Sequence, residues 1–133
     1  MYNFYNIGGY SMKLNYDCIR DILLYVEDNT TFENYTISVV NLTEYLKDKY
    51  EVDTIYYHIQ KIDQTDLVDK VIWADNAPMR IFSLSWEGHQ YLDSIRDDSV
   101  WKSVTEKIKP LKSVPLQMIV PIATELIKQK LGM

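Results

Sequence analysis

The stretch LSWEGHQYLDSIRDD, residues 84–98, holds the residue types in this chain that are most able to do chemistry. Glu87 and His89 lie close together, and a Glu near a His can serve a zinc site or general acid–base catalysis. Catalytic zinc usually takes three protein ligands, whereas the chain has only two histidines, His58 and His89. Residues two positions apart on a helix face different sides, so Glu87 does not orient His89. We therefore expect no metal site.

A structural interpretation explains the same stretch as a corner between a strand and a helix. Ser85 would cap the helix, and Gly88 would let that helix pack closely on its neighbour. Trp86 would cover an edge of the core. Two pairs have the spacing of surface ion pairs: His89 with Asp93, and Asp93 with Arg96. We therefore interpret Trp86, Gly88 and His89 as a structural signature.

The rest of the chain lacks the motifs of common enzymes. No G-x-S-x-G, P-loop or dinucleotide-binding glycine pattern occurs. The single cysteine, Cys18, lies beside a helical apolar stripe and is best explained as a small core residue. We therefore expect a protein that is not an enzyme, with no catalytic residue and no cofactor.

Length and composition indicate one folded domain. The chain has 133 residues, of which 47% are hydrophobic and 25% charged. No apolar run reaches the length of about 18 residues that a membrane span needs. The first residues lack the basic start and apolar run of a secretory signal, and one cysteine excludes an internal disulfide. We expect a cytoplasmic protein.

The charge is distributed unevenly along the chain. Residues 1–100 carry 8 Lys and Arg against 17 Asp and Glu, a net charge of −9, whereas residues 101–133 carry 6 Lys and 2 Glu, a net charge of +4. A typical nucleic-acid-binding protein has a basic face that neutralises phosphates. Here the main body is acidic and only the tail is basic. The simplest interpretation is a solvated surface without a partner.

The first half of the chain predicts three helices and a short strand. Residues 1–11 are expected to be a flexible leader. Asn15 would cap a helix over residues 16–28, and TISVV is typical of a strand. Asn41 would cap a second helix, with Glu44 completing a capping box. A third helix is predicted over residues 54–64, with Asp53 as its cap.

The second half predicts a hairpin followed by helices. Strand-like runs over residues 67–75 and 79–86 flank a turn at residues 76–78, where Pro78 suits the turn better than a central strand. One helix would follow Ser85, and another would stop before Pro110.

The closing segment, residues 110–133, is predicted to form an amphipathic helix. Pro121 either starts this helix or kinks it, and Gly132 would end it. Its apolar face has three explanations: packing on its own domain, a homodimer, or contact with a membrane surface.

The order of these elements predicts a mainly α protein with a small β-hairpin, an α+β fold. Helix, strand, two helices, hairpin and further helices follow each other as in a winged helix-turn-helix core with C-terminal helices. We expect the winged-helix domain at residues 12–109 and the C-terminal amphipathic helix at residues 110–133.

Four stretches resemble a known family: KLNYDCIRDILLYVE, TIYYHIQKIDQTDLV, LSWEGHQYLDSIRDDSVWKSVTEKI and IKQKLG. That family consists of uncharacterised proteins of bacteria, phages and prophages, and is known only as a domain of unknown function. The resemblance covers residues 12–133 and implies that residues 1–11 are an upstream extension. It implies no activity or cofactor. More distantly, YHIQKIDQTDLV and LSWEGHQYL are similar to patterns of winged-helix transcription regulators, with Asp66 where those proteins usually have glycine.

The first functional hypothesis is a transcription regulator, of phage type, that binds double-stranded DNA. Helix 54–64 would read the major groove and the hairpin would contact the backbone. The expected DNA contacts are Thr54, Tyr57, His58, Lys61, Gln64, Lys70 and Arg80. Against this hypothesis, residues 53–66 hold one Lys and three Asp. A homodimer through the C-terminal helix would match a palindromic site.

The alternative hypothesis is a protein-binding winged-helix adaptor, or a phage factor that engages a basic host protein. An acidic surface favours a basic partner and speeds its association. Tyrosine is enriched at interfaces, and the chain has 11.

Overall fold

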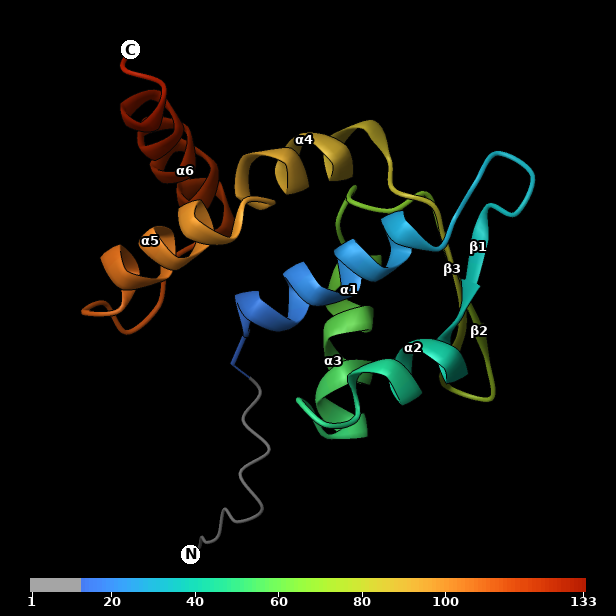
Figure 1. Ribbon diagram of the computed structural model, residues 1–133. Helices are drawn as coiled ribbons and strands as arrows, with labels where there is room; N and C mark the ends of the chain where they lie inside the picture. The colour runs from blue at the N-terminus through green and yellow to red at the C-terminus, as the bar shows by residue number, and fades with distance from the viewer. Residues whose placement is uncertain (1–12) are drawn as a thin grey trace, which may run out of the picture.

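The computed structural model describes residues 13–133, so the predicted leader at residues 1–11 lies outside the described residues (Figure 1). Within this range six helices and three strands follow one another. Their bounds are α1 Tyr16–Asp28, β1 Thr36–Ser38, α2 Val39–Leu46, α3 Val52–Asp63, β2 Val71–Ala74, β3 Ala77–Phe82, α4 Trp86–Ile95, α5 Asp98–Ile108 and α6 Leu116–Lys130. The α+β expectation is confirmed, and the arrangement is consistent with a winged helix.

The sheet is antiparallel with strand order β1-β3-β2. A two-residue turn joins β2 to β3, and both of its residues, Asp75 and Asn76, have positive φ (52° and 66°). The expectation that Pro78 lies in the turn is wrong, because Pro78 lies in β3, the central strand. Proline is tolerated there because β1 pairs only with Arg80 to Phe82, which leaves β3 paired on one side at Pro78.

The predicted caps at the start of α1 and α4 are confirmed, whereas those of α2 and α3 are wrong. Asn15 Oδ1 accepts the Cys18 N–H at 3.2 Å. The strand before α2 has three residues, and Ser38 rather than Asn41 caps the helix by accepting the Asn41 N–H at 3.4 Å. Helix α3 begins at Val52, two residues before the predicted start, and Asp53 lies in its first turn.

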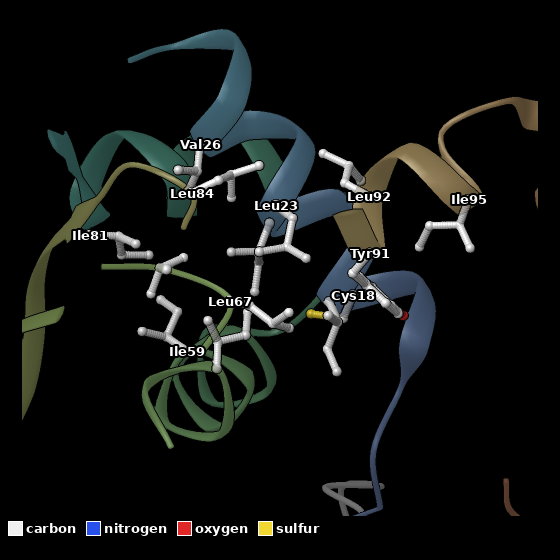
Figure 2. Packing of buried hydrophobic residues seen from close by; sticks show 14 of the residues in the cluster. Cys18, Leu23, Val26, Ile59, Leu67, Ile81, Leu84, Tyr91, Leu92 and Ile95 are labelled. Atoms are coloured by element: carbon white, nitrogen blue, oxygen red, sulfur yellow. The ribbon is translucent and has the colours of Figure 1, made fainter. Parts of the chain in front are cut away.

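One hydrophobic core joins α1, α3, α4 and the sheet (Figure 2). Leu23 from α1, Ile59 from α3, Ile81 from β3 and Leu92 from α4 are all fully buried in it. Cys18 is also fully buried, and burial raises the pKa of its thiol to about 12. This confirms Cys18 as a core residue.

A buried arginine connects α1 to the corner between α4 and α5. Arg20 is 8% exposed. Its Nε donates to the Ile95 carbonyl at 2.9 Å, and its Nη2 donates to the Arg96 carbonyl at 2.7 Å and to Asp98 Oδ1 at 2.8 Å. The guanidinium therefore satisfies carbonyls at the end of α4, where intrahelical donors are lacking.

A buried histidine connects α3 to the start of α1. His58 is 1% exposed, and its Nε2 accepts the Asn15 backbone N–H at 2.8 Å. Because Nε2 accepts, Nδ1 carries the proton and donates to the Thr54 carbonyl at 2.7 Å. Burial lowers the pKa of His58. The expectation of an exposed His58 is wrong, because the start of α1 covers that flank of α3.

The corner between β3 and α4 depends on a glycine. Ser85 Oγ accepts the Gly88 N–H at 2.9 Å and donates to the Asp66 carbonyl. A Cβ on Gly88 would lie 1.9 Å from the Leu67 carbonyl oxygen, so the predicted close packing is confirmed. Trp86 is 74% exposed, so the expectation that it covers the core is wrong. Two residues along a helix turn a side chain about 200°, which points Trp86 away from the face that Gly88 buries.

The C-terminal helix α6 packs on α4 and α5 of the same chain (Figure 1), burying Ile119 and Ala123. Pro121 lies inside the helix rather than in its first turn. Gly132 ends the helix as predicted, with φ of 73°, and the Met133 N–H donates to the Lys128 carbonyl at 2.9 Å. Among residues 13–133 no helix is both long and apolar enough to cross a bilayer.

Gly88→Ala should lower the free energy of unfolding by about 2–3 kcal/mol, because the new Cβ would displace the Leu67 backbone. Alanine has a higher helix propensity than glycine by about 1 kcal/mol, so the clash must cost more free energy than this gain. Urea unfolding followed by circular dichroism measures the change. The matched control is Gln90→Ala, at an exposed position of the same helix, which should change stability little. A Gly88→Ala variant as stable as the control would contradict the packing argument.

The stability should decrease as the pH falls below about 6.5, the ordinary pKa of a histidine in the unfolded chain. The pKa of His58 is lowered in the folded protein, so the unfolded chain binds the proton first. The contribution of neutral His58 is complete above this pH and is lost at up to about 1.4 kcal/mol per pH unit below it. NMR titration should place the His58 midpoint below that of an unfolded peptide. His58→Gln should show a shallower loss of stability between pH 7 and 5, and an equal loss in both proteins would refute the assignment.

Candidate functional site

Helix α3 presents a polar outward face. Gln64 is exposed there, whereas Thr54, Tyr57 and Lys61 are half-buried. Lys61 Nζ lies 5.2 Å from the centroid of the Tyr57 ring, a cation–π contact that holds the lysine against the helix. The structure therefore places Thr54, Tyr57 and Lys61 on α3 and Gln64 directly after its last residue. His58 is not on this outward face, because it is buried against α1.

The hairpin formed by β2 and β3, which is the predicted wing and is called the wing below, lies beside α3. Trp73 Nε1 donates to Asp63 Oδ2 at 2.9 Å, and this bond fixes the hairpin to the end of the helix. The sequence alone does not predict this pair. A tryptophan in a short strand next to a two-residue turn was the available signal, but only the packing shows what it contacts.

The two basic residues predicted in the wing differ in their surroundings. Arg80 is exposed, but its Nε donates to Thr36 Oγ1 at 2.8 Å, so its guanidinium is directed toward β1. Lys70 is exposed, and within residues 13–133 no carboxylate lies within ion-pair distance of its ammonium group. Of these two cations, Lys70 is the one available to an incoming phosphate.

The surface formed by α3 and the wing, which we call the α3–wing surface, is acidic. It comprises the charged residues between positions 51 and 83, which are Glu51, Asp53, Lys61, Asp63, Asp66, Asp69, Lys70, Asp75 and Arg80. Six carboxylates of this segment thus outnumber three cations. All six acidic residues are exposed, so this surface repels a polyanion.

Apolar side chains interrupt the acidic α3–wing surface. Val52 is 45% exposed, Trp73 is 36% exposed and Met79 is 44% exposed. Exposed apolar and aromatic groups within a charged rim are typical of protein-binding surfaces.

The signature residues Trp86, Gly88 and His89 lie in the first part of α4, at the corner where β3 leads into that helix. His89 Nδ1 lies 3.4 Å from Glu27 Oε2, and Glu27 also accepts two hydrogen bonds from Arg96. Those bonds lower the pKa of the Glu27 carboxyl.

The predicted pair of Asp93 with Arg96 is confirmed at 2.6 Å, whereas the neighbour of His89 is Glu27 rather than Asp93. Among the described residues no three His, Cys, Asp or Glu side chains are grouped as ligands for a metal ion.

Comparison with known proteins places this chain in a family. Residues 13–115 match the model of a family of hypothetical proteins designated DUF2513. An uncharacterised protein of Haemophilus influenzae is 31% identical over 125 residues, which are 91% of this chain and all of that protein. No solved structure matches the chain. The match extends from the start of α1 through α5, and the chain belongs to the DUF2513 family.

Proposed function

We propose that this protein is a protein-binding winged-helix adaptor whose α3–wing surface engages a basic partner. One observation carries the proposal. In the segment that forms α3 and the wing, with which a DNA-binding winged helix would contact phosphates, six exposed carboxylates outnumber three cations. The negative electrostatic potential of these carboxylates attracts a basic protein and repels a nucleic-acid duplex.

The surroundings of the basic residues also favour a protein partner over DNA. Lys61 lies over the Tyr57 ring, and Arg80 is bonded to Thr36, so both cations already have partners in the protein. His58 is buried and neutral. Non-specific DNA affinity comes mainly from Lys and Arg that neutralise phosphates, and Lys70 alone of the seven predicted DNA contacts adds an unengaged positive charge.

The apolar residues of this surface would supply the binding energy. Interfaces depend on a few aromatic and apolar anchors, and charged residues around them set the rate and specificity of association. Trp73 and Tyr57 are aromatic, and Met79 is exposed and has the unbranched side chain that adapts readily to a partner surface. The bond of Trp73 to Asp63 holds one anchor in place before binding, which lowers the entropic cost of association.

Transcription regulation through double-stranded DNA is the second candidate, and the arrangement of α2, α3 and the wing favours it. In that function α3 would enter the major groove. Tyr57, Lys61 and Gln64 lie on the side of α3 away from its buried residues and would meet bases and phosphates.

Fluorescence anisotropy with two labelled probes, an arginine-rich peptide and a random-sequence duplex, separates the two functions. The peptide should bind at about 50 mM salt and dissociate as salt rises, whereas the duplex should not bind. Asp53→Asn combined with Asp66→Asn should weaken peptide binding about fivefold, as expected for the loss of two exposed charges.

The matched control, Glu87→Gln combined with Glu125→Gln, removes the same charge from α4 and α6 and should have a smaller effect. If both double variants weaken the peptide equally, the α3–wing surface is not the binding site. Salt-sensitive duplex binding that is lost in Lys61→Ala and Lys70→Ala would establish the DNA-binding function instead.

A further inference from the structure

A groove with a basic rim lies beside α5, in the C-terminal part of the chain that carries a positive net charge. It runs between the start of α1, the helix α5 and the connection from α5 to α6, which lie beside one another in Figure 1. The part next to the connection has a volume of about 520 Å³. Its apolar lining consists of Leu14, Tyr16, Ile108, Leu111, Val114 and Pro115. This volume is enough for several apolar side chains of a peptide.

Two hydrogen bonds hold the walls of this groove in place. The Tyr16 hydroxyl donates to the Val114 carbonyl at 2.6 Å, which fixes the α5–α6 connection to α1. Trp101 Nε1 donates to Asp17 Oδ1 at 2.7 Å, which fixes α5 to the same turn of α1. The groove is therefore formed before any partner arrives, and binding costs little reorganisation.

Apolar side chains remain accessible at the mouth of the groove. Leu14 is 43% exposed and Leu111 is 60% exposed, and they come from different segments, one just before α1 and the other just after α5. The hydrogen bond between Tyr16 and Val114 holds both segments in place, because Tyr16 lies close to Leu14 and Val114 lies close to Leu111 in the chain. Two exposed leucines beside an apolar concavity are typical of a site that accepts apolar groups from a partner.

Lysines outnumber carboxylates on the rim of the groove. Its charged lining residues are Lys13, Lys102, Lys109 and Lys112 against Asp17 and Glu106. Lys49 and Lys130 elsewhere in the chain form ion pairs with carboxylates. For Lys102, Lys109 and Lys112, in contrast, no carboxylate of residues 13–133 lies within ion-pair distance.

We propose that this groove binds an acidic amphipathic peptide segment of a partner protein. Apolar side chains of the peptide would fill the space between Leu14 and Leu111, and its carboxylates would pair with Lys109 and Lys112. The mode is that of an amphipathic helix in a groove. The inference does not depend on the function proposed for the α3–wing surface, which lies on other elements and has the opposite charge.

The shape and chemistry of the groove favour a peptide over other anions. A nucleic-acid duplex would satisfy the lysines but has no apolar group to place between the two leucines. A bilayer surface is flat and cannot enter a concave site. Only a partner with carboxylates and apolar side chains on one face uses both features.

The test uses three labelled probes: a designed helical peptide with Leu and Glu on one face, the same peptide with Lys in place of Glu, and a random-sequence duplex. Only the acidic peptide should bind this groove. Lys109→Glu combined with Lys112→Glu should weaken its binding at least tenfold, measured by anisotropy. Leu14→Gln combined with Leu111→Gln should also weaken it, because these exposed positions provide the apolar contact without supporting the core.

The matched control is Lys107→Glu combined with Lys128→Glu, which makes the same charge change outside the groove lining. It should reduce acidic-peptide binding far less than the groove variant. Equal losses in both, or loss of duplex binding rather than peptide binding in the groove variant, would overturn the proposal. Asp53→Asn with Asp66→Asn should leave acidic-peptide binding intact, so failure here is distinct from failure at the α3–wing surface.

Discussion

The buried guanidinium of Arg20 is the interaction on which the arrangement of the two halves of the protein depends. It joins the middle of α1 to the corner where α4 ends and α5 begins. A buried charge is tolerated only when its donors are satisfied, and here two carbonyls and a carboxylate accept from it. The carbonyls of Ile95 and Arg96 in turn lack intrahelical donors, so each side of the contact satisfies the other.

The first turn of α1 concentrates the other long-range polar contacts. The Asn15 N–H reaches His58 on α3, the Tyr16 hydroxyl reaches Val114, and Asp17 accepts from Trp101. A segment of a few residues thus connects α3 with α5 and the α5–α6 connection. These contacts also shape the basic-rimmed groove, so the same bonds that stabilise the fold hold the walls of the proposed peptide site.

The charge of the molecule is separated between two surfaces. The α3–wing surface is acidic and interrupted by Trp73 and Met79, whereas the groove beside α5 is apolar with lysines on its rim. Each surface combines unneutralised charge with exposed apolar groups, which is how specific protein contacts are usually built. Under the two proposals made above, these surfaces would bind two different partners.

The sequence by itself determined the features that depend on neighbouring residues. Apolar spacing predicted the helices, and Asn15 and Ser85 were correctly assigned as caps, because periodicity and capping are local. Gly88 was correctly predicted to lie where α4 packs closely on its neighbour. The candidate site was predicted only in part: Tyr57, Lys61 and Gln64 lie on the outward side of α3, as expected. The burial of His58, the exposure of Trp86 and the turning of Arg80 toward Thr36 were decided by the tertiary structure. Each depends on which distant element covers a residue, and that choice is made by packing across the whole chain rather than by the residues on either side.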